Sequence, residues 1–508
     1  MNRKFYVRTF GCQMNEHDSE RLAVDLEAAG LERTGVLEEA DVVVLNTCCI
    51  RENADNKLYG HLGHLKSLRD RRPGLQIAVG GCLAQKDREA LLDRAPFVDV
   101  VLGTHNVHRA HALLEAARLE GRPQLEVLDA PGDDPDALPS ATRVRPELAY
   151  SAWVTIQVGC DNSCAFCIVP SVRGPEQSRP FGDLLDEVAA LAADGTTEVT
   201  LLGQNVNSYG RDLATALRGR VAGGTNELAR LTGPAWVAEG ARRRRPLFAD
   251  LLRAVGAVPG IRRVRFTSPH PKDLRPETVA AMAETPAVCE QLHLPLQSGS
   301  DTVLAAMRRG YTAERYLERL AAARARIVDL AVTTDVIVGF PGETDADFEA
   351  TLEVVAEARY DSAFTFIFSP RPGTRAAAMT DRFVPEGVVA ERFERLRVVV
   401  ERSALRANEA RVGRLEEVVV EGPSRKDPGI LAGRTRQGKL CHFPSAEAAR
   451  LAGGPVAPGT YGTVEVAAAA PHHLVGHLVA LGPQVAPALT PAGPLVGRRR
   501  RSIPVQVG

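Results

Sequence analysis

Three cysteines within a dozen residues constrain this chain more than any other feature. The stretch GCDNSCAFCIVP, residues 159–170, holds Cys160, Cys164 and Cys167 in a CxxxCxxC spacing. Three thiolates on one short loop can bind three irons of a four-iron cluster and leave the fourth iron open to a small molecule. The spacing therefore predicts a 4Fe-4S cluster whose open iron is the reactive position.

Two other uses of these cysteines remain as alternatives. A disulfide is disfavoured because nothing at the start of the sequence resembles a signal peptide, and cytosolic thiols stay reduced. A structural zinc site usually takes four ligands in CxxC pairs, whereas this stretch has no second pair and no nearby histidine. The iron–sulfur interpretation is the favoured one.

The same stretch resembles the radical-SAM superfamily, in which an aromatic residue stands before the last cysteine, as Phe166 stands before Cys167 here. The resemblance implies that the open iron chelates the amino and carboxylate groups of S-adenosylmethionine (SAM). It also implies that reduction splits SAM to a 5′-deoxyadenosyl radical, with Phe166 beside the cofactor.

Size and composition describe an ordinary water-soluble chain. With 508 residues, 44% of them hydrophobic and 25% charged, it is long enough for roughly three domains. No apolar run approaches the roughly 20 residues that span a bilayer, so we expect no membrane association and a cytoplasmic location. A net charge of −1 argues against a uniformly basic surface for nucleic acid but allows local basic patches.

The first domain, residues 1–130, contains three apolar runs that each end next to a cysteine. FYVRTF precedes Gly11 and Cys12, DVVVLNT precedes Cys48, and QIAVGG precedes Cys82. Helical patterns lie between the runs, which predicts a doubly wound sheet of parallel strands. Because such strands end at one edge, the three cysteines are expected to converge there. The alternative is three unrelated buried cysteines.

The strings GCQMNEHDSE, NTCCIRENA and GGCLAQ resemble the N-terminal domain of the methylthiotransferase family. The resemblance implies that Cys12, Cys48 and Cys82 bind an auxiliary 4Fe-4S cluster. Cys49 stands where the family more often has a small residue and is interpreted as a bystander, although it could replace Cys48.

After a linker rich in Pro, Asp and Ala (131–147), the central domain is expected to cover residues 148–378. Six apolar runs alternate with helical patterns or turns, which predicts parallel strands with crossover helices in a partial (β/α)6 barrel. The six runs are 153–158, 198–203, 263–268, 290–295, 333–339 and 364–369.

Each of the six runs is followed by a string rich in Gly, Pro, Ser, Asn or Gln. Such strings are most often simple turns, but six at the C-terminal ends of barrel strands predict one site at the barrel mouth. LLGQNVNSYG, HLPLQSGS, MRRGYT and DVIVGFPGET are similar to strings of the methylthiotransferase family. That similarity implies SAM contacts by Gly203, Gln204, Phe340, Gly342 and Glu343. No acid–base residue is predicted, because hydrogen abstraction by a radical requires none.

A segment at residues 210–246, which ends in four arginines (242–245), is longer than the connection that related proteins have there. The favoured interpretation is a solvated, disordered loop. The alternative is a loop that contacts phosphates, because lysine and arginine dominate backbone contacts to nucleic acid.

The C-terminal region begins with a helical connector (379–410) and continues in short strand-like runs with glycine turns (411–482), which predict a small β-barrel. It resembles the TRAM domain, an RNA-binding module. The basic residues expected to meet phosphates, with a solvated edge as the alternative for each, are Arg425, Lys426, Arg434, Arg436 and Lys439. Residues 483–508 are expected to form a disordered tail.

Together these regions resemble the tRNA methylthiotransferase family over residues 4–480. The resemblance implies sulfur insertion at C2 of an isopentenylated adenine beside the anticodon, followed by methylation (i6A37 to ms2i6A37), with SAM used twice. The implied partners are the tRNA anticodon stem-loop, a reductase such as flavodoxin or ferredoxin, and a sulfur source, with the chain as a monomer.

Three other functions are compatible with the same cysteine pattern. Sister enzymes methylthiolate an aspartate of a small-subunit ribosomal protein or threonylcarbamoyl-adenosine in tRNA. GQNVNSYG, residues 203–210, resembles the tRNA branch. An alternative of another class is a non-catalytic iron–sulfur protein that binds RNA and senses redox state.

Overall fold

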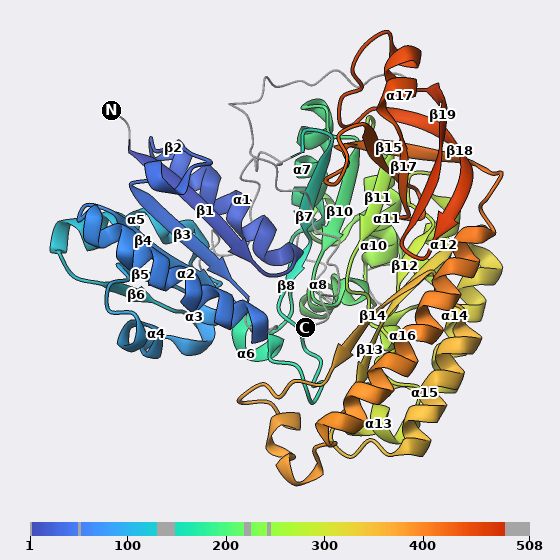
Figure 1. The fold of residues 1–508 in the computed structure, drawn as a ribbon, viewed down its shortest axis with the longest axis horizontal. Helices are drawn as coiled ribbons and strands as arrows, with labels where there is room; N and C mark the ends of the chain where they lie inside the picture. Colours follow the sequence, from blue (N-terminus) through green and yellow to red (C-terminus); the bar gives the residue numbers. More distant parts are fainter. Residues whose placement is uncertain (1–2, 49–51, 130–147, 218–224, 241–244, 483–508) are drawn as a thin grey trace.

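A computed structural model describes residues 3–48, 52–129, 148–217, 225–240 and 245–482. These residues form three structural regions in the order that the sequence predicts (Figure 1). The N-terminal region packs beside a central barrel, and a smaller barrel caps one end of the central one. The predicted linker (131–147), Cys49 and the predicted tail (483–508) lie outside the described residues.

The N-terminal region is a six-stranded sheet in the order β2-β1-β3-β4-β5-β6 whose neighbouring strands are all parallel. Every residue of β3 and β4 is buried, because helices cover both faces of the sheet. The predicted doubly wound sheet is therefore confirmed. Its strands are β1 (Lys4–Phe10), β2 (Glu32–Arg33), β3 (Val42–Thr47), β4 (Gln76–Gly81), β5 (Val100–Leu102) and β6 (Gln124–Glu126), and its helices are α1 (Gln13–Ala28), α2 (Glu52–Arg71), α3 (Cys82–Asp87), α4 (Glu89–Arg94) and α5 (Ala110–Glu120).

The central region has six parallel strands in chain order, as predicted. They form two three-stranded sheets, and a parallel bridge between Val264 and Val288 joins the two. The strands are β7 (Ser151–Thr155), β10 (Glu198–Leu202), β11 (Arg263–Phe266), β12 (Gln291–His293), β13 (Ala331–Val338) and β14 (Ser362–Ile367). Helices cover the outer face of the strands, and they are α7 (Phe181–Ala193), α11 (Phe248–Gly256), α12 (Pro276–Glu284), α13 (Asp301–Ala306), α14 (Ala313–Arg326) and α15 (Asp345–Ala358).

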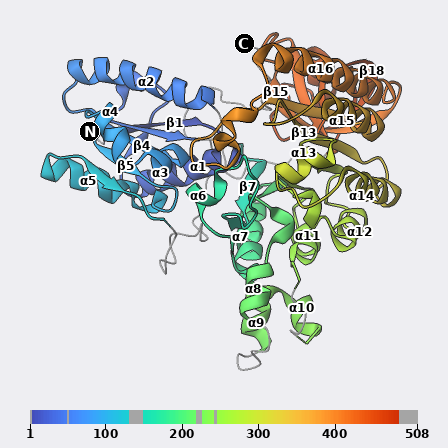
Figure 2. The ribbon, with the colours of Figure 1, turned by 90° about the horizontal axis from the view of Figure 1, so that it is seen from below.

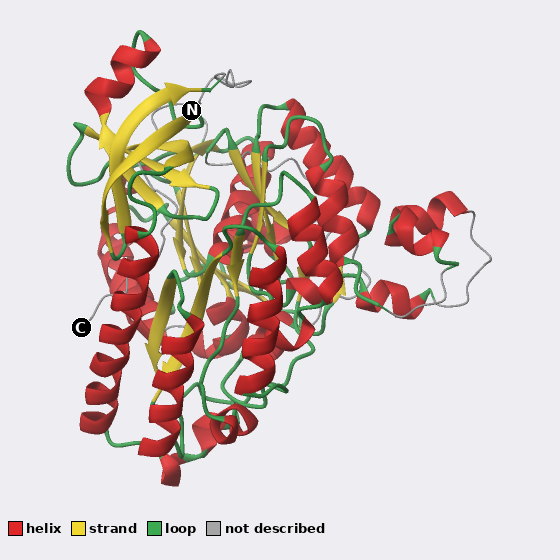
Figure 3. Cartoon of the chain, turned by 90° about the vertical axis from the view of Figure 1, so that its right-hand side faces the viewer, coloured by secondary structure: helices red, strands yellow, loops and turns green. Residues whose placement is uncertain are grey.

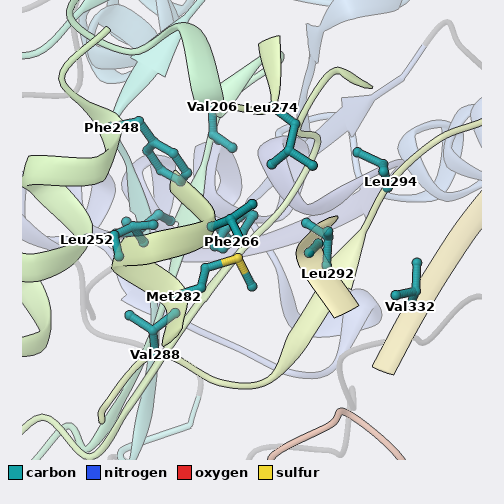
Figure 4. Packing of buried hydrophobic residues seen from close by; sticks show 14 of the residues in the cluster. Val206, Phe248, Leu252, Phe266, Leu274, Met282, Val288, Leu292, Leu294 and Val332 are labelled. Carbon is teal, nitrogen blue, oxygen red and sulfur yellow. The ribbon is translucent and has the colours of Figure 1, made fainter. Parts of the chain in front are cut away.

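The barrel is held by one large apolar core. Figure 4 shows Phe248 of α11, Phe266 of β11, Met282 of α12 and Leu292 of β12 gathered from four elements. The rings of Phe248 and Phe266 meet edge to face with centroids 5.2 Å apart.

The segment at 210–246 differs from the expectation of a solvated, disordered loop. Its described residues form α8 (Arg211–Ala216), α9 (Thr225–Thr232) and α10 (Pro234–Ala238), which project from the barrel (Figures 2 and 3). Trp236 is fully buried, and Arg230 forms ion pairs of 2.8 Å with both Asp183 and Asp186 of α7. For the described residues that expectation was wrong, because Trp236 packs in the same apolar core as Phe181 of α7. Arg242, Arg243 and Arg244 lie outside the described residues.

The C-terminal region is a closed five-stranded barrel, as predicted, with strand order β15-β16-β17-β19-β18. Its elements are β15 (Leu415–Pro423), β16 (Ile430–Thr435), β17 (Leu440–Pro444), α17 (Ser445–Ala452), β18 (Tyr461–Ala470) and β19 (His473–Leu481), and the connector is α16 (Glu386–Glu409).

The small barrel docks on the starting ends of the central strands. Arg263, which begins β11, forms a 2.8 Å ion pair with Glu417, and Glu290, just before β12, forms one of 2.8 Å with Arg436. Tyr461 donates a 3.1 Å hydrogen bond to Thr197, just before β10. The small barrel thus covers the end of the central barrel opposite the predicted site.

A buried histidine at the contact between α1 and β7 should make the stability of the fold depend on pH. His17 is buried, Nδ1 lies 2.9 Å from Thr155 Oγ1, and burial followed by nearby arginines lowers its pKa from 6.5 to about 3. The imidazole is neutral in the fold but gains a proton when unfolded below pH 6.5, so its contribution to stability is lost as pH falls. Lowering pH from 7 to 5 should therefore cost about 2 kcal/mol through this group. Urea unfolding of wild type and His17→Gln at both pH values measures it, and equal pH dependence in the two proteins would contradict it.

None of the helices built by the described residues is long and apolar enough to cross a membrane.

Candidate metal and cofactor site

The loop of Cys160, Cys164 and Cys167 is fixed by backbone contacts at the barrel mouth. It leaves β8 (Gln157–Val158) and leads directly into α6 (Val169–Arg173). Cys160 N donates to Gly174 O at 3.0 Å, and Ala165 N donates to Met307 O at 2.9 Å. Gly159 has φ +77°, and a Cβ there would lie 1.9 Å from a backbone oxygen, so only glycine fits before Cys160.

Burial alone would keep the thiols of this loop protonated. It raises the pKa of Cys160 to about 11 and that of Cys167 to about 12. Because metals bind the thiolate, the positive charge of a bound metal would have to offset that burial. One cation already reaches the loop: Arg309 Nη1 donates to Cys164 Sγ at 3.3 Å.

The second cysteine group lies at the carboxyl ends of three neighbouring strands. Cys12 precedes α1 after β1, Cys48 follows β3, and Cys82 begins α3 after β4. The Cys48 thiol interacts by hydrogen bonds with those of both Cys12 and Cys82. The hydrogen bond with Cys48 lowers the pKa of Cys12 to about 7, close to the range in which a thiol ionises readily. The structure thus brings together three residues separated by gaps of 36 and 34 in the sequence.

The two cysteine groups lie close to each other. Cys12 packs against Val158, which ends β8, and Leu202, which ends β10, and Cys82 belongs to the same apolar cluster as Ile168 and Val172. In Figure 1, α6 lies between the N-terminal sheet and the barrel. The helix that follows Cys167 therefore packs directly beside the Cys12, Cys48 and Cys82 group.

A buried ion pair strengthens this contact. Arg173, the last residue of α6, lies 2.8 Å from Asp18 of α1, and both side chains are almost fully buried. The charge of Arg173 also acts on Cys12 and Cys82. A positive charge at this position favours thiolates in the group.

The loops at the barrel mouth are joined by hydrogen bonds. Asn205 Nδ2 donates to Asp273 at 2.9 Å, and Asn207 Nδ2 donates to His270 O at 3.1 Å. Tyr311 Oη donates to Leu296 O at 2.8 Å. The strings after β10 and β11 are thus joined to each other.

The residues predicted to contact SAM divide into three kinds. Phe166 and Phe340 lie in one apolar cluster with Ala165, next to the cysteine loop. Gln204 presents a buried Oε1 that has no hydrogen-bond partner among the described atoms. Glu343 is instead used inside the protein, where Oε1 accepts from Arg392 at 2.7 Å.

Gly203 and Gly342 occupy tight positions. A Cβ on Gly203 would lie 2.8 Å from Gln157 Cγ, and one on Gly342, at φ +85°, would lie 2.4 Å from the Arg382 guanidinium. The left-handed φ of Gly342 favours glycine there, and a side chain at Gly203 would require Gln157 to move.

The donor set fits the implied cofactors. Two groups of three thiols lie on neighbouring elements, and buried acceptor oxygens of Gln157, Gln204 and Asn205 near the mouth have no partner among the described atoms. Such oxygens suit N–H groups like the amino group of SAM. Within the described residues no set of three His, Cys, Asp or Glu side chains has an arrangement that would hold a single metal ion. In a cluster, each cysteine binds a different iron.

The five basic residues predicted to bind RNA do not share one role. Arg436 pairs with Glu290, and Lys439 forms a 2.7 Å ion pair with Asp361, so both attach the small barrel to the central one. Arg434 pairs with Glu421 at 2.6 Å within the small barrel. Arg425 and Lys426 are exposed. Lys426 lines a cavity of about 460 Å³ together with His442, Phe443, His473 and His477.

Sequence reasoning did not assign Arg309 and Arg173. Arg309 lies in the MRRGYT string that marks the family, but nothing in that string indicates a contact with a cysteine. Arg173 follows the cysteine loop, and its partner Asp18 is 155 residues away in the chain.

Two family models match the chain, one in the N-terminal region and one in the central region. Residues 4–103 match the Uncharacterized protein family UPF0004, and residues 154–355 match the Radical SAM superfamily. In solved structures, the chain is similar to the radical S-adenosylmethionine methyltransferase TsrM from Kitasatospora setae, solved with cobalamin and a 4Fe-4S cluster bound. That likeness has a TM-score of 0.50 at 14% identity, over 74% of this chain and 77% of the other, and it shows the fold alone.

Curated relatives are much more similar in sequence. The chain is 53% identical to the tRNA-2-methylthio-N(6)-dimethylallyladenosine synthase of Mycobacterium sp. (strain JLS), over 93% of this chain and 88% of that protein. It is 51% identical to the enzyme of the same name from Salinispora arenicola (strain CNS-205), over 100% of this chain and 94% of the other. At such identity over nearly full length, this chain belongs to the tRNA-2-methylthio-N(6)-dimethylallyladenosine synthase family of radical-SAM methylthiotransferases.

Proposed function

We propose that this chain adds a methylthio group to C2 of an N6-isopentenylated adenine beside the anticodon of tRNA, converting i6A37 to ms2i6A37. The observation that carries the proposal is 51–53% identity, over 93–100% of the chain, to relatives named for making that nucleoside. The adjacency of two cysteine groups supports it, because sulfur insertion needs a reactive centre and a sulfur-bearing centre close together.

The residues of the chain have distinct tasks in this reaction. Cys160, Cys164 and Cys167 would hold one 4Fe-4S cluster, and Cys12, Cys48 and Cys82 the auxiliary one. When bound, the clusters and SAM supply radical chemistry, which suits an aromatic C–H bond that has no easily removed proton. Cys48, Cys82 and Cys160 are buried and the other three cysteines are half-buried, and α6 packs beside the Cys12, Cys48 and Cys82 group.

The reaction requires three partners. The substrate is the anticodon stem-loop, the electron comes from a flavodoxin- or ferredoxin-like reductase, and a separate sulfur source renews the sulfur that is transferred. The chain acts as a monomer in the cytoplasm, where tRNA is modified.

Mass spectrometry of tRNA nucleosides from a deletion strain tests the substrate. Loss of 2-methylthio-isopentenyladenosine is expected, and its persistence would favour the ribosomal-protein or threonylcarbamoyl-adenosine alternatives.

A prediction on iron content follows from the two cysteine groups. Anaerobically reconstituted wild type should hold about eight irons, and the Cys160→Ala/Cys164→Ala/Cys167→Ala variant about four, because each group holds one cubane. Iron and sulfide analysis measures both proteins. Equal iron in the two proteins would show that the loop binds no cluster.

A prediction on RNA binding follows from the exposure of Arg425 and Lys426. Replacing both by alanine should weaken binding of an anticodon stem-loop and lower the slope of log K against log salt by roughly 1.4, about 0.7 for each phosphate contact. Arg450→Ala is the matched control, since Arg450 is exposed on α17 of the same barrel. Filter binding at several salt concentrations measures the slope. An unchanged slope in the double variant would remove these two residues from the RNA interface.

A further inference from the structure

Arg309 is a buried cation whose donors all point to neutral groups or to sulfur. Its side chain is almost inaccessible, and the whole residue is 6% exposed. Nη1 donates to Cys164 Sγ at 3.3 Å, Nε donates to Tyr311 Oη at 3.2 Å, and Nη2 donates to Pro295 O at 3.5 Å. Tyr311 in turn hydrogen-bonds the carbonyl oxygens of Pro295 and Leu296, so the guanidinium is held in one orientation.

The charge of Arg309 is not neutralised by a carboxylate. Among the residues that the structure describes, no ion pair joins it to Asp or Glu. Other buried arginines of the chain are paired: Arg173 with Asp18 at 2.8 Å, Arg392 with Glu343 at 2.7 Å and Arg411 with Glu416 at 2.6 Å. A buried charge without an opposite charge is strongly unfavourable. We therefore infer that the negative charge that balances Arg309 comes from the cysteine loop.

A cluster on that loop supplies the counter-charge. An oxidised four-iron core carries two positive charges and three thiolates carry three negative ones, so the whole set is a monoanion. One electron from an external reductant makes it a dianion, with no bond made or broken and no proton moved. Arginine stays protonated throughout. Its attraction to the cluster is therefore stronger after reduction than before, and N–H donation to a ligand sulfur acts in the same direction.

We propose that Arg309 is the positioning residue that supplies the counter-cation of the Cys160, Cys164 and Cys167 cluster and favours its reduced form. The inference rests on the cluster that the proposed function places there, but not on the RNA substrate. Arg309 sits one residue after Arg308 and two before Tyr311, in the turn that follows α13. The turn carries Met307 O, which accepts from Ala165 N of the cysteine loop. One short segment thus holds the backbone of the cysteine loop in place and puts a positive charge next to Cys164.

The test measures the reduction potential of this cluster alone. The full chain with Cys12→Ala/Cys48→Ala/Cys82→Ala isolates it, and Arg309→Met and Arg309→Lys are placed on that background. Titration with dithionite, followed by electron paramagnetic resonance, gives the potential in the absence of SAM and RNA. Arg319→Met is the matched control, since Arg319 of α14 donates to Pro271 O and to no cysteine among its described contacts.

Arg309→Met should lower the equilibrium constant for one-electron reduction at least tenfold, which is a 59 mV fall in potential. Arg309→Lys, which keeps the charge, should lose clearly less, and Arg319→Met should match the background protein. If Arg309→Met binds no iron while Arg309→Lys and Arg319→Met do, that result would also support the need for a positive charge at this position. An unchanged potential in Arg309→Met, or loss of iron in both Arg309 variants, would overturn the proposal. Neither result would bear on which RNA is modified.

Discussion

Replacing Cys160, Cys164 and Cys167 by alanine abolishes both formation of 5′-deoxyadenosine and methylthiolation of RNA. We expect this complete loss because these three residues would hold the cluster to which SAM binds. The Cys12→Ala/Cys48→Ala/Cys82→Ala variant should lose only one of the two activities. It retains 5′-deoxyadenosine formation but makes no methylthiolated product, because the two groups lie on separate domains and perform separate tasks.

The measurement is an anaerobic assay of 5′-deoxyadenosine and of RNA nucleosides in the same reaction. Cys441→Ala is the matched control, because Cys441 is buried in the small barrel, away from both groups. It should retain both activities. If the second triple variant still makes product, the auxiliary cluster is not the source or carrier of sulfur. If wild type with a full complement of iron makes no 5′-deoxyadenosine, the alternative of a redox-sensing protein is favoured.

Arg392→Ala is expected to destabilise the fold by about 3–5 kcal/mol, the second largest effect that the structure predicts. Arg392 of α16 donates to Glu343 Oε1 at 2.7 Å, and both side chains are buried. Removal of the arginine leaves a carboxylate without its opposite charge in the protein interior. Arg395→Ala is the control on the same helix, because its 2.6 Å pair with Glu349 is half exposed and should contribute no more than about 1 kcal/mol.

The loss should depend on pH. Burial raises the pKa of Glu343 above 4.5, although the Gly339 N–H and Arg392 oppose the rise. Without Arg392 the pKa rises further, so the folded variant binds a proton at a pH where the unfolded chain does not. Its stability then increases as pH falls and is lost as pH rises through the folded pKa. Urea unfolding at pH 8 and pH 5.5 should show the smaller deficit at pH 5.5, and an equal deficit would exclude Glu343 as its origin.

Periodic patterns of the sequence predicted the three regions well. Apolar runs that end in cysteine or glycine located strands β1, β3 and β4, and the parallel-sheet rule placed Cys12, Cys48 and Cys82 at one edge. The same reasoning located all six barrel strands and the mouth formed by their loops. Local sequence suffices here because strand burial and strand order follow directly from the spacing of apolar residues.

Partners that are distant in the chain could not be predicted. Arg436 and Lys439 resemble surface residues in sequence, yet their partners Glu290 and Asp361 stand at the start of barrel strands. Their role depends on the docking of the small barrel at that end. Long-range ion pairs such as Arg173 with Asp18 have no local pattern for the same reason. For the segment at 210–246, the four consecutive arginines favoured a solvated loop, whereas the burial of Trp236 in α10 depends on packing that local sequence does not show.

The central claim is that two adjacent clusters allow this chain to methylthiolate an isopentenylated adenine. The most direct test incubates the reconstituted protein with SAM, a reductant and two anticodon stem-loops that differ only in the N6-isopentenyl group. Mass spectrometry should find 2-methylthio-isopentenyladenosine from the modified RNA and no methylthiolated adenosine from the unmodified one. No methylthiolated nucleoside from either RNA, with 5′-deoxyadenosine still formed, would contradict the account.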